Sequence, residues 1–415
     1  QILFLALPCI FIVILDGDKY KDELNYLQPH EGIWLVSEGC ASMDDLLEGY
    51  DASSLTIATL GSHSALDICK GAKAEGLRTL VVCEARREKV YATHYKSRTV
   101  WGRPVGVVDE TVVIEKFAHV TRANVVQQLR RRNCIFIPHR SFTVYVPYDA
   151  IEKQFPVPMF GNRWLLRVEE RDSPMNQYHV LEKANIRTPK RFTSPEAIDR
   201  LTIVKVAEAE RPYERAFFYA ANEADYKRIA SDLLKRGAVT EAALKSAVME
   251  EFVVGAQFNF NFFYSPLNDE LELLGVDTRR QTNIDGLLKL PASEQLKVAD
   301  MIQTKTIEIG HIACTVRESM LEQIFDAGER FVQAAKETHP PGVIGPFALQ
   351  GSIVPGPPRE EIVVFDVSLR VPGSPGTAFT PYSEYNWRTP ISVGRRIAME
   401  VKQAAEQNRL AEVVT

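Results

Sequence analysis

The sequence predicts an α/β protein that opens with a doubly wound parallel sheet. Between residues 55 and 140, short apolar runs typical of strands alternate with amphipathic stretches typical of helices. The runs 55–60, 79–83 and 134–137 contain almost no polar side chain, which indicates strands covered by helices on both faces. Small polar turns follow the first and last of these runs, where a parallel sheet gathers its ligands.

The elements of this first domain can be assigned in chain order. Strand 55–60 leads into a helix from about residue 65 that ends at Gly76. Strands 79–83 and 111–114 follow, then a helix over 125–132 and a strand over 134–137. The proline-rich segment 155–158 marks the transition to the next region.

The rest of the chain predicts a mostly antiparallel arrangement. A helix ends near Ala184, and Ser194 with Pro195 has the pattern of a helix start. Strands 202–206 and 216–220 pair and are followed by a helix to Arg236. Later elements are expected as strands over 248–254, 257–264, 270–276, 343–353 and 361–368, and as helices over 321–332 and 393–406.

Composition excludes several classes of protein. The chain has 415 residues, and its 49 Lys and Arg against 54 Asp and Glu give a formal charge of −5. A nearly balanced charge offers no global footprint for nucleic acid, so no nucleic-acid partner is expected. The six cysteines form no CxxC pair and the eight histidines no HxxxH pair. This pattern indicates a cytoplasmic protein without a structural zinc site.

The N-terminal run 1–15 is apolar throughout but shorter than the ~20 residues that span a bilayer. It has no basic residue ahead of it, unlike a signal peptide. A buried strand, or a segment outside the native protein, is therefore preferred over a membrane anchor, and no membrane partner is expected.

Two turns at strand ends are candidate ligand sites. Gly61-Ser62-His63-Ser64 follows one strand and Pro138-His139-Arg140-Ser141 follows another. Backbone N–H groups and hydroxyls in such turns suit an anion. The alternative is a tight structural turn, and either histidine alone is more often a hydrogen-bonded structural residue.

Charged residues inside apolar strands are a second set of candidates. Lys205 lies in strand 202–206 and should need an anionic partner, unless that strand is an exposed edge. Gln350 and Asp366 lie in strands that could face each other across a ladder, and Mg²⁺ with a nucleotide would suit that pair. Ser368 and Arg370 alternate with Asp366 and would share its face. Other polar clusters, for which surface charge is the alternative, are Glu250-Glu251, Arg279-Arg280, Asn283 and Arg317-Glu318.

Long motifs along the chain resemble one family. In chain order they include TIATLGSHSALDICKGAKAEGL, IPHRSF, FPVPMFGNRWLLR, EEFVVGAQFNFNFFYSPL, DTRRQTNIDGLLKLPA and VVFDVSLRV. From about Met43 to the C-terminus they resemble the archaeal PurP family of formate-dependent ligases in purine (IMP) biosynthesis. The resemblance implies an ATP-grasp fold with an N-terminal segment 1–42, a Rossmann-like domain 43–155, a nucleotide-binding subdomain 156–255 and a catalytic subdomain 256–415.

The resemblance also implies an activity and its residues. ATP would phosphorylate formate to formyl phosphate, which the amino group of AICAR would attack to give FAICAR. His63, Ser64 and Ser141 would bind AICAR. ATP would be held by Lys205, the 250–253 hinge (Glu250, Glu251, Phe252, Val253) and Gln257. Arg279, Asn283 and Arg317 would line the shared pocket, and Gln350 with Asp366 would reach Mg²⁺ or Mn²⁺. A homo-oligomer is expected.

The chain departs from the family pattern at several positions. The segment 207–215 reads AEAERPYER where the family has a glycine-rich phosphate loop. His179 falls at the position of a lysine, Arg140 at that of a glycine, and 372–377 replaces a Gly-Gly-Thr-Asn run. Two alternatives therefore stand beside the AICAR ligase: a paralogue that binds a purine nucleotide without ATP turnover, as a regulatory or partner subunit, and a ligase for another small acid.

Overall fold

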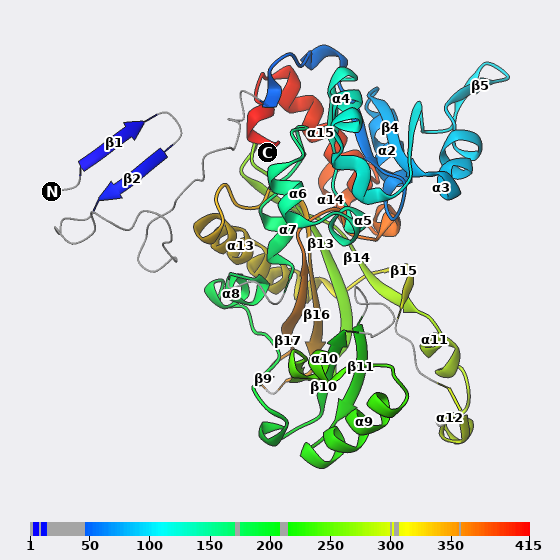
Figure 1. Ribbon diagram of the computed structural model, residues 1–415, viewed down its shortest axis with the longest axis vertical. Helices are drawn as coiled ribbons and strands as arrows, with labels where there is room; N and C mark the ends of the chain where they lie inside the picture. The colour runs from blue at the N-terminus through cyan, green and yellow to red at the C-terminus, as the bar shows by residue number, and fades with distance from the viewer. Residues whose placement is uncertain are drawn as a thin grey trace.

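A computed structural model describes residues 3–7, 10–14, 46–170, 175–207, 215–298, 301–302, 307–356 and 358–415. Near the N-terminus, β1 (Leu3–Leu7) and β2 (Ile10–Ile14) pair as an antiparallel hairpin. The remainder forms a parallel sheet at one end and two antiparallel sheets below it (Figure 1). No helix in these ranges is long and apolar enough to cross a membrane.

The parallel sheet has the strand order β7-β4-β3-β8. Its strands are β3 (Thr56–Leu60), β4 (Arg78–Glu84), β7 (Glu110–Ile114) and β8 (Cys134–Phe136), and all their pairings are parallel. Helices α2 (Ala65–Ala74) and α4 (Ala123–Arg131) connect them as the sequence predicts. The doubly wound prediction is confirmed, because the predicted strands 55–60 and 134–137 lie side by side in one sheet.

Several shorter helices and strands connect the strands of this sheet or follow its last strand. Those between the strands are α3 (Ala85–Lys89), a π-helical turn (Val90–His94), the hairpin of β5 (Arg98–Val100) and β6 (Arg103–Val105), and a 3₁₀ turn (Phe117–Thr121). Those after β8 are α5 (Arg140–Tyr145), α6 (Tyr148–Lys153) and α7 (Leu165–Val168).

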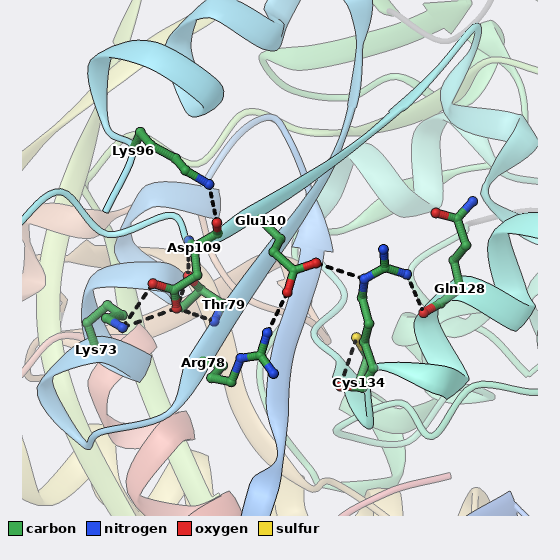
Figure 2. Close-up of polar contacts among 9 residues, drawn as sticks. Lys73, Arg78, Thr79, Lys96, Asp109, Glu110, Gln128 and Cys134 are labelled. Carbon is green, nitrogen blue, oxygen red and sulfur yellow. Dashed lines mark hydrogen bonds and ion pairs between the residues drawn. The ribbon is translucent and has the colours of Figure 1, made fainter. Parts of the chain in front are cut away.

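Polar contacts fix the edge of the parallel sheet that lies away from the strand carboxyl ends (Figure 2). Asp109, just before β7, accepts hydrogen bonds from Lys73 Nζ at 3.1 Å and from the backbone N–H of Thr79 at 2.9 Å. Glu110 pairs with Arg78 at 2.5 Å and with Arg132 at 2.8 Å. These contacts lie at the amino ends of the strands, so they serve to hold the sheet.

The small antiparallel sheet has the order β11-β10-β12-β9. Its strands are β9 (Arg191–Phe192), β10 (Thr202–Ala207), β11 (Arg215–Ala220) and β12 (Val248–Glu251). Helices α9 (Glu223–Lys235) and α10 (Glu241–Lys245) pack against it, whereas α8 (Gln177–Lys183) packs against the helix Leu321–Thr338 of the next region. The start signal at Ser194 yields only one 3₁₀ turn, Pro195–Ala197, in which the serine side chain makes no capping hydrogen bond.

The large antiparallel sheet has the order β15-β14-β13-β16-β17. Its strands are β13 (Ala256–Ser265), β14 (Glu270–Gln281), β15 (Glu308–Cys314), β16 (Gly345–Val354) and β17 (Glu361–Ser368). Strand β12, which the sequence groups with β13 and β14, instead pairs with β10 and β9. Strand β15 has no counterpart among the predicted elements, because its side chains are half-buried or exposed and carry no clear apolar alternation.

Alternating side chains of β13 build a core on each face of the large sheet. Phe262 packs in the cluster that contains α13 (Leu321–Thr338), and Phe263 packs in the one that contains α15 (Val393–Glu406). Smaller elements of this region are α11 (Ile284–Leu287), α12 (Ala292–Val298), α14 (Tyr382–Trp387) and 3₁₀ turns over Glu318–Met320, Pro375–Phe379 and Leu410–Glu412.

Two glycines let the first and last regions of the chain pack closely. A Cβ on Gly71 of α2 would lie 2.1 Å from the backbone nitrogen of Arg395, and one on Gly394 of α15 would lie 2.2 Å from the carbonyl oxygen of Asp67. The Asp67 carboxylate accepts a hydrogen bond of 2.9 Å from the Gly394 N–H. Helix α15 therefore fixes the parallel sheet relative to the large antiparallel sheet.

Candidate functional site

A cavity of about 500 Å³ lies where the carboxyl ends of β3 and β8 face the large antiparallel sheet. We call the turns after β3 and β8 its wall and the side chains of β13 to β17 its floor. The wall contributes His63, Arg140 and Ser141, and the floor contributes Asn259, Asn261, Asp277, Arg279, Glu308, His311, Gln350, Asp366, Ser368 and, just beyond β17, Arg370. Phe217 of the small sheet also reaches it.

On the wall, His63 is neutral. Its ring reaches the cavity surface, and desolvation by the surrounding protein is the main cause that holds its pKa well below the usual value, to which the charges of Arg370 and His311 add. The Ser64 hydroxyl donates to the Pro372 carbonyl at 2.8 Å, so it accepts from His63 Nδ1, which lies 2.8 Å away. Ser64 thus orients the ring and leaves Nε2 as a hydrogen-bond acceptor.

His139 supports the wall from behind. Its ring stacks on that of His63, with centroids 5.5 Å apart. Its Nε2 donates to the Leu60 carbonyl at 2.9 Å, and its Nδ1 accepts from the Ser141 N–H at 3.2 Å. Burial lowers the pKa of His139 to about 4. The ring is therefore a structural, neutral cap that places Ser141 against the cavity.

The pair Gln350 and Asp366 lies on the floor as the sequence predicts. The two residues are direct partners in the β16–β17 ladder, and both line the cavity. Ser368 and Arg370 share this side, and Gln350 Nε2 donates to Ser368 Oγ at 2.8 Å. The prediction that these four side chains share one face is confirmed.

A group of floor residues was missed by sequence reasoning. Asp277, fully buried on β14, accepts from Asn259 at 2.8 Å and from Asn261 at 2.6 Å. His311 and Glu308 on β15 extend this group, and Glu308 pairs with Arg279 at 2.9 Å. The signal for β13 was present in QFNFNFFY, where asparagine alternates with phenylalanine and so shares one face. His311 gave no such signal.

A buried ion pair closes one side of the cavity. Glu169 lies 3.4 Å from Arg370 Nε and 3.8 Å from Arg140 Nη1, and it accepts the Leu369 N–H at 2.6 Å. Burial raises the pKa of Glu169, opposed by the two arginines, and lowers that of Arg370. Arg140, which stands where the family has glycine, is thus accommodated by a carboxylate.

On the small sheet, Lys205 forms an ion pair with Glu250, the anionic partner that its place in an apolar strand demands. Glu250 also accepts from the Tyr178 hydroxyl at 2.8 Å. The other residues assigned to ATP lie at the end of β12 and the start of β13. Glu251, Phe252 and Val253 are half-buried and Gln257 is exposed, and none of these residues is part of the cavity lining.

Two residues assigned to the shared pocket lie outside it. The Arg317 side chain is 65% exposed and pairs with Glu360 at 2.7 Å. Asn283 is exposed at the start of α11, with a φ of 43°. Residues 208–214 of the altered phosphate loop, including Arg211, lie outside the described residues.

The floor suits a hard cation. Asp366 offers a carboxylate and Gln350 an amide oxygen, and Mg²⁺ favours one or two such protein ligands together with water and phosphate oxygens. In the parts of the chain that the structure describes, no three His, Cys, Asp or Glu side chains cluster as a metal site. An ion shared with a phosphate ligand therefore fits these residues better than one held by protein alone.

Comparisons with known proteins identify the family of this chain. Two family models match, described as a protein of unknown function (DUF1246) over residues 57–192 and a domain of unknown function (DUF1297) over 225–415. The chain is 41% identical over 374 residues to a 5-formaminoimidazole-4-carboxamide-1-(beta)-D-ribofuranosyl 5'-monophosphate synthetase from Methanothermobacter thermautotrophicus, covering 89% of this chain and 97% of that one. A synthetase of the same name from Methanopyrus kandleri is 40% identical over 89% of this chain and 98% of its own.

Comparison with solved structures supports the same family. The IMP biosynthesis protein PurP from Thermococcus kodakaraensis superimposes with a TM-score of 0.63 at 29% identity, over 86% of this chain and 100% of that one. An N5-carboxyaminoimidazole synthetase from Staphylococcus aureus, at 11% identity and a TM-score of 0.54 over 85% and 79% of the two chains, shares the fold alone. The fold is ATP-grasp, and the chain belongs to the PurP family.

Proposed function

We propose that this protein is an ATP- and formate-dependent ligase that converts AICAR to FAICAR in purine biosynthesis. The observation that carries the proposal is the 41% identity along 97% of a relative named as the synthetase of that product. The cavity supports it, because one side offers hydrogen-bonding groups and the Arg140 guanidinium for a nucleotide, and the other offers cations and carboxylates for phosphoryl transfer.

The reaction has two steps. A formate oxygen attacks the γ-phosphorus of ATP and ADP leaves, which gives formyl phosphate. The amino nitrogen of AICAR then attacks the formyl carbon, phosphate leaves, and the nitrogen loses one proton. Both steps need reactants held in line and charge balanced around the phosphate oxygens, rather than a nucleophilic side chain.

AICAR would lie along the wall. The Ser141 hydroxyl and the Arg140 guanidinium line the cavity and can donate to the ribose phosphate. His63 Nε2 can accept a hydrogen bond from the base or its amino group, and Ser64 acts through the ring that it orients. Asn283 and Arg317 would join this group only by approaching the cavity.

ATP and formate would meet over the floor. Lys205 and Glu250 with the backbone of 251–253 and Gln257 would hold the nucleotide. Arg279 and Arg370 face the cavity, where a guanidinium stabilises the charge of formate and of the transferring phosphoryl group. Mg²⁺ or Mn²⁺, held by Gln350 and Asp366, would neutralise the phosphate oxygens.

The test is to incubate the protein with ATP, formate, AICAR and Mg²⁺ and to measure FAICAR and ADP. Both products are expected in equal amounts, and omission of formate or AICAR should stop FAICAR formation. Asp366→Asn is the matched variant, because the asparagine side chain has nearly the same shape as aspartate but no charge. This variant is expected to lose FAICAR formation. A folded parent that makes neither product contradicts the proposal, and ADP release with another small acid in place of formate points to a different ligase.

A second candidate is a nucleotide-binding subunit without ATP turnover. The feature that favours it is the acidic segment 207–215, in which Glu208, Glu210 and Glu214 would repel a triphosphate unless Arg211 and Arg215 compensate. Calorimetry with ATP·Mg²⁺ and with AICAR separately decides between the two, because this candidate binds AICAR and not ATP. Light scattering would test the homo-oligomer that the family resemblance favours.

A further inference from the structure

His311 connects the two halves of the floor. It lies on edge strand β15 directly opposite Arg279 of β14, and Asp277 is its diagonal neighbour on the same side. Its Nδ1 contacts Asp277 Oδ2, and its Nε2 lies 2.6 Å from Glu308 Oε1. Because a carboxylate oxygen accepts, both ring nitrogens donate, and His311 is an imidazolium.

The hydrogen bonds continue from His311 in both directions. On one side, Asp277 accepts from the side chains of Asn259 and Asn261. On the other side, Glu308 pairs with Arg279, which donates to Gln350, which in turn donates to Ser368. One chain of polar contacts therefore crosses all five strands of the large sheet, and His311 is the link between its two arms.

The charge of His311 is needed where it lies. Asp277 is fully buried, and Glu308 lies on the other side of the same ring. Burial would raise the pKa of Glu308, but the hydrogen bond from His311 and the charge of Arg279 outweigh it and lower that pKa. Without the imidazolium, two carboxylates would share one site, and their repulsion would release Glu308 from Arg279.

Backbone packing holds the ring in place. A Cβ on Gly373 would lie 2.8 Å from His311 Nε2 and 3.1 Å from His63 Nε2, so any larger residue in this segment would require the two rings to move. The His311 side chain is only 11% exposed. The ring is therefore fixed by Asp277, Glu308 and the 372–374 segment.

We propose that His311 is a positioning residue of this site: held between Asp277 and Glu308, it orients Arg279 and Gln350 toward the reacting groups. This inference rests on the proposed ligase function. His311 lines the cavity beside Arg279, and its two ring hydrogen bonds are both used on carboxylates, so it acts through Glu308 on Arg279. Misplacement of one such guanidinium by about 1 Å costs on the order of 100-fold in rate.

The experiment compares His311→Gln, which keeps one donor but loses the charge, with His311→Lys, which restores a charge. The matched control is His339→Gln, a half-buried histidine outside the cavity whose Nδ1 contacts Thr338 Oγ1 at 2.9 Å. We expect His311→Gln to lower kcat by roughly 100-fold with the KM for AICAR little changed. His311→Lys should recover part of that loss, and His339→Gln should behave as the parent.

The outcomes separate this inference from the proposed function. A parent that makes no FAICAR overturns both. An active parent whose His311→Gln variant keeps the parental kcat overturns the positioning role alone. A His311→Gln variant that loses kcat only in proportion to its folded fraction, measured by thermal unfolding, and is not rescued by His311→Lys also overturns it, because the histidine is then merely structural.

Discussion

Histidines on the two sides of the cavity differ in protonation. On the wall, neither histidine has a carboxylate partner: fully buried His139 has a lowered pKa and accepts the Ser141 N–H with Nδ1, and the pKa of His63 is lowered in the same direction. On the floor, burial also opposes the charge of His311, but its two carboxylate partners outweigh that cost and raise its pKa to about 9. The partner, rather than the degree of burial, decides which histidine is charged.

This difference in charge suggests different roles for the two sides of the cavity. The wall offers the neutral groups of His63 and Ser141 to a nucleotide base through directional hydrogen bonds, and its one cation, Arg140, is paired with Glu169. A floor with alternating guanidinium, imidazolium and carboxylate groups can stabilise a moving phosphoryl group. We expect substitutions on the wall to change AICAR binding and those on the floor to change turnover.

The largest expected effect comes from removing a floor cation. Arg279→Ala should lower FAICAR formation by roughly 100- to 1,000-fold, the usual cost of losing one charge-stabilising donor. Arg317→Ala should lower it by less than about fivefold, since this side chain is exposed and forms a surface ion pair. Initial rates at saturating ATP and formate measure both. Equal losses would show that Arg317 reaches the substrates, as the family resemblance implies.

The second-largest expected effect is a change in how the free energy of unfolding depends on pH. An unfolded histidine has a pKa near 6.5, so the folded protein binds fewer protons at His139, whose pKa is about 4, and more at His311, whose pKa is about 9. Stability linked to His139 is present above pH 6.5 and is lost as the pH falls toward 4. Stability linked to His311 is present below pH 6.5 and is lost as the pH rises through 9. Each loss is about 3 kcal/mol in full.

Urea unfolding at pH 5, 7 and 9 measures these losses in the parent, His139→Asn and His311→Gln. The His139 variant should lose less stability than the parent between pH 7 and 5, and the His311 variant less between pH 7 and 9. Other titrating groups are common to the proteins compared and largely cancel in the difference. Parallel pH profiles for all three would refute the assignment of opposite protonation states.

The smallest expected effect comes from the segment between wall and floor. Gly373→Ala places a methyl group 2.8 Å from His311 Nε2 and should cost about 1–3 kcal/mol of stability through overpacking. It should also lower kcat by about tenfold, because the displaced ring moves Glu308 and Arg279. Gly376→Ala is the control, since its Cβ would meet only Ala313 Cβ at 3.7 Å. If the two variants had the same kcat and KM, Gly373 would have no part in positioning the floor residues.

The sequence by itself determined most of the elements, though not β15, and several faces of the sheets. The strands of the parallel sheet, helix α15 and the common face of Asp366 and Ser368 follow from local periodicity, because a side chain two residues away in a strand must share its face. The need of Lys205 for an anion also follows from sequence, since a charge within an apolar strand cannot be buried alone.

Only the tertiary structure decided which strands adjoin and which groups meet. Strand β12 lies in the small sheet rather than beside β13, and edge strand β15 brings His311 opposite Arg279 across a gap of 32 positions in the chain. The charge of His311, the neutrality of His139 and the exposure of Arg317 depend on partners and burial supplied by distant segments. Periodicity indicates the face of a strand or helix on which a side chain lies. The burial and the neighbouring charges that set its protonation state come from distant segments that folding brings into contact.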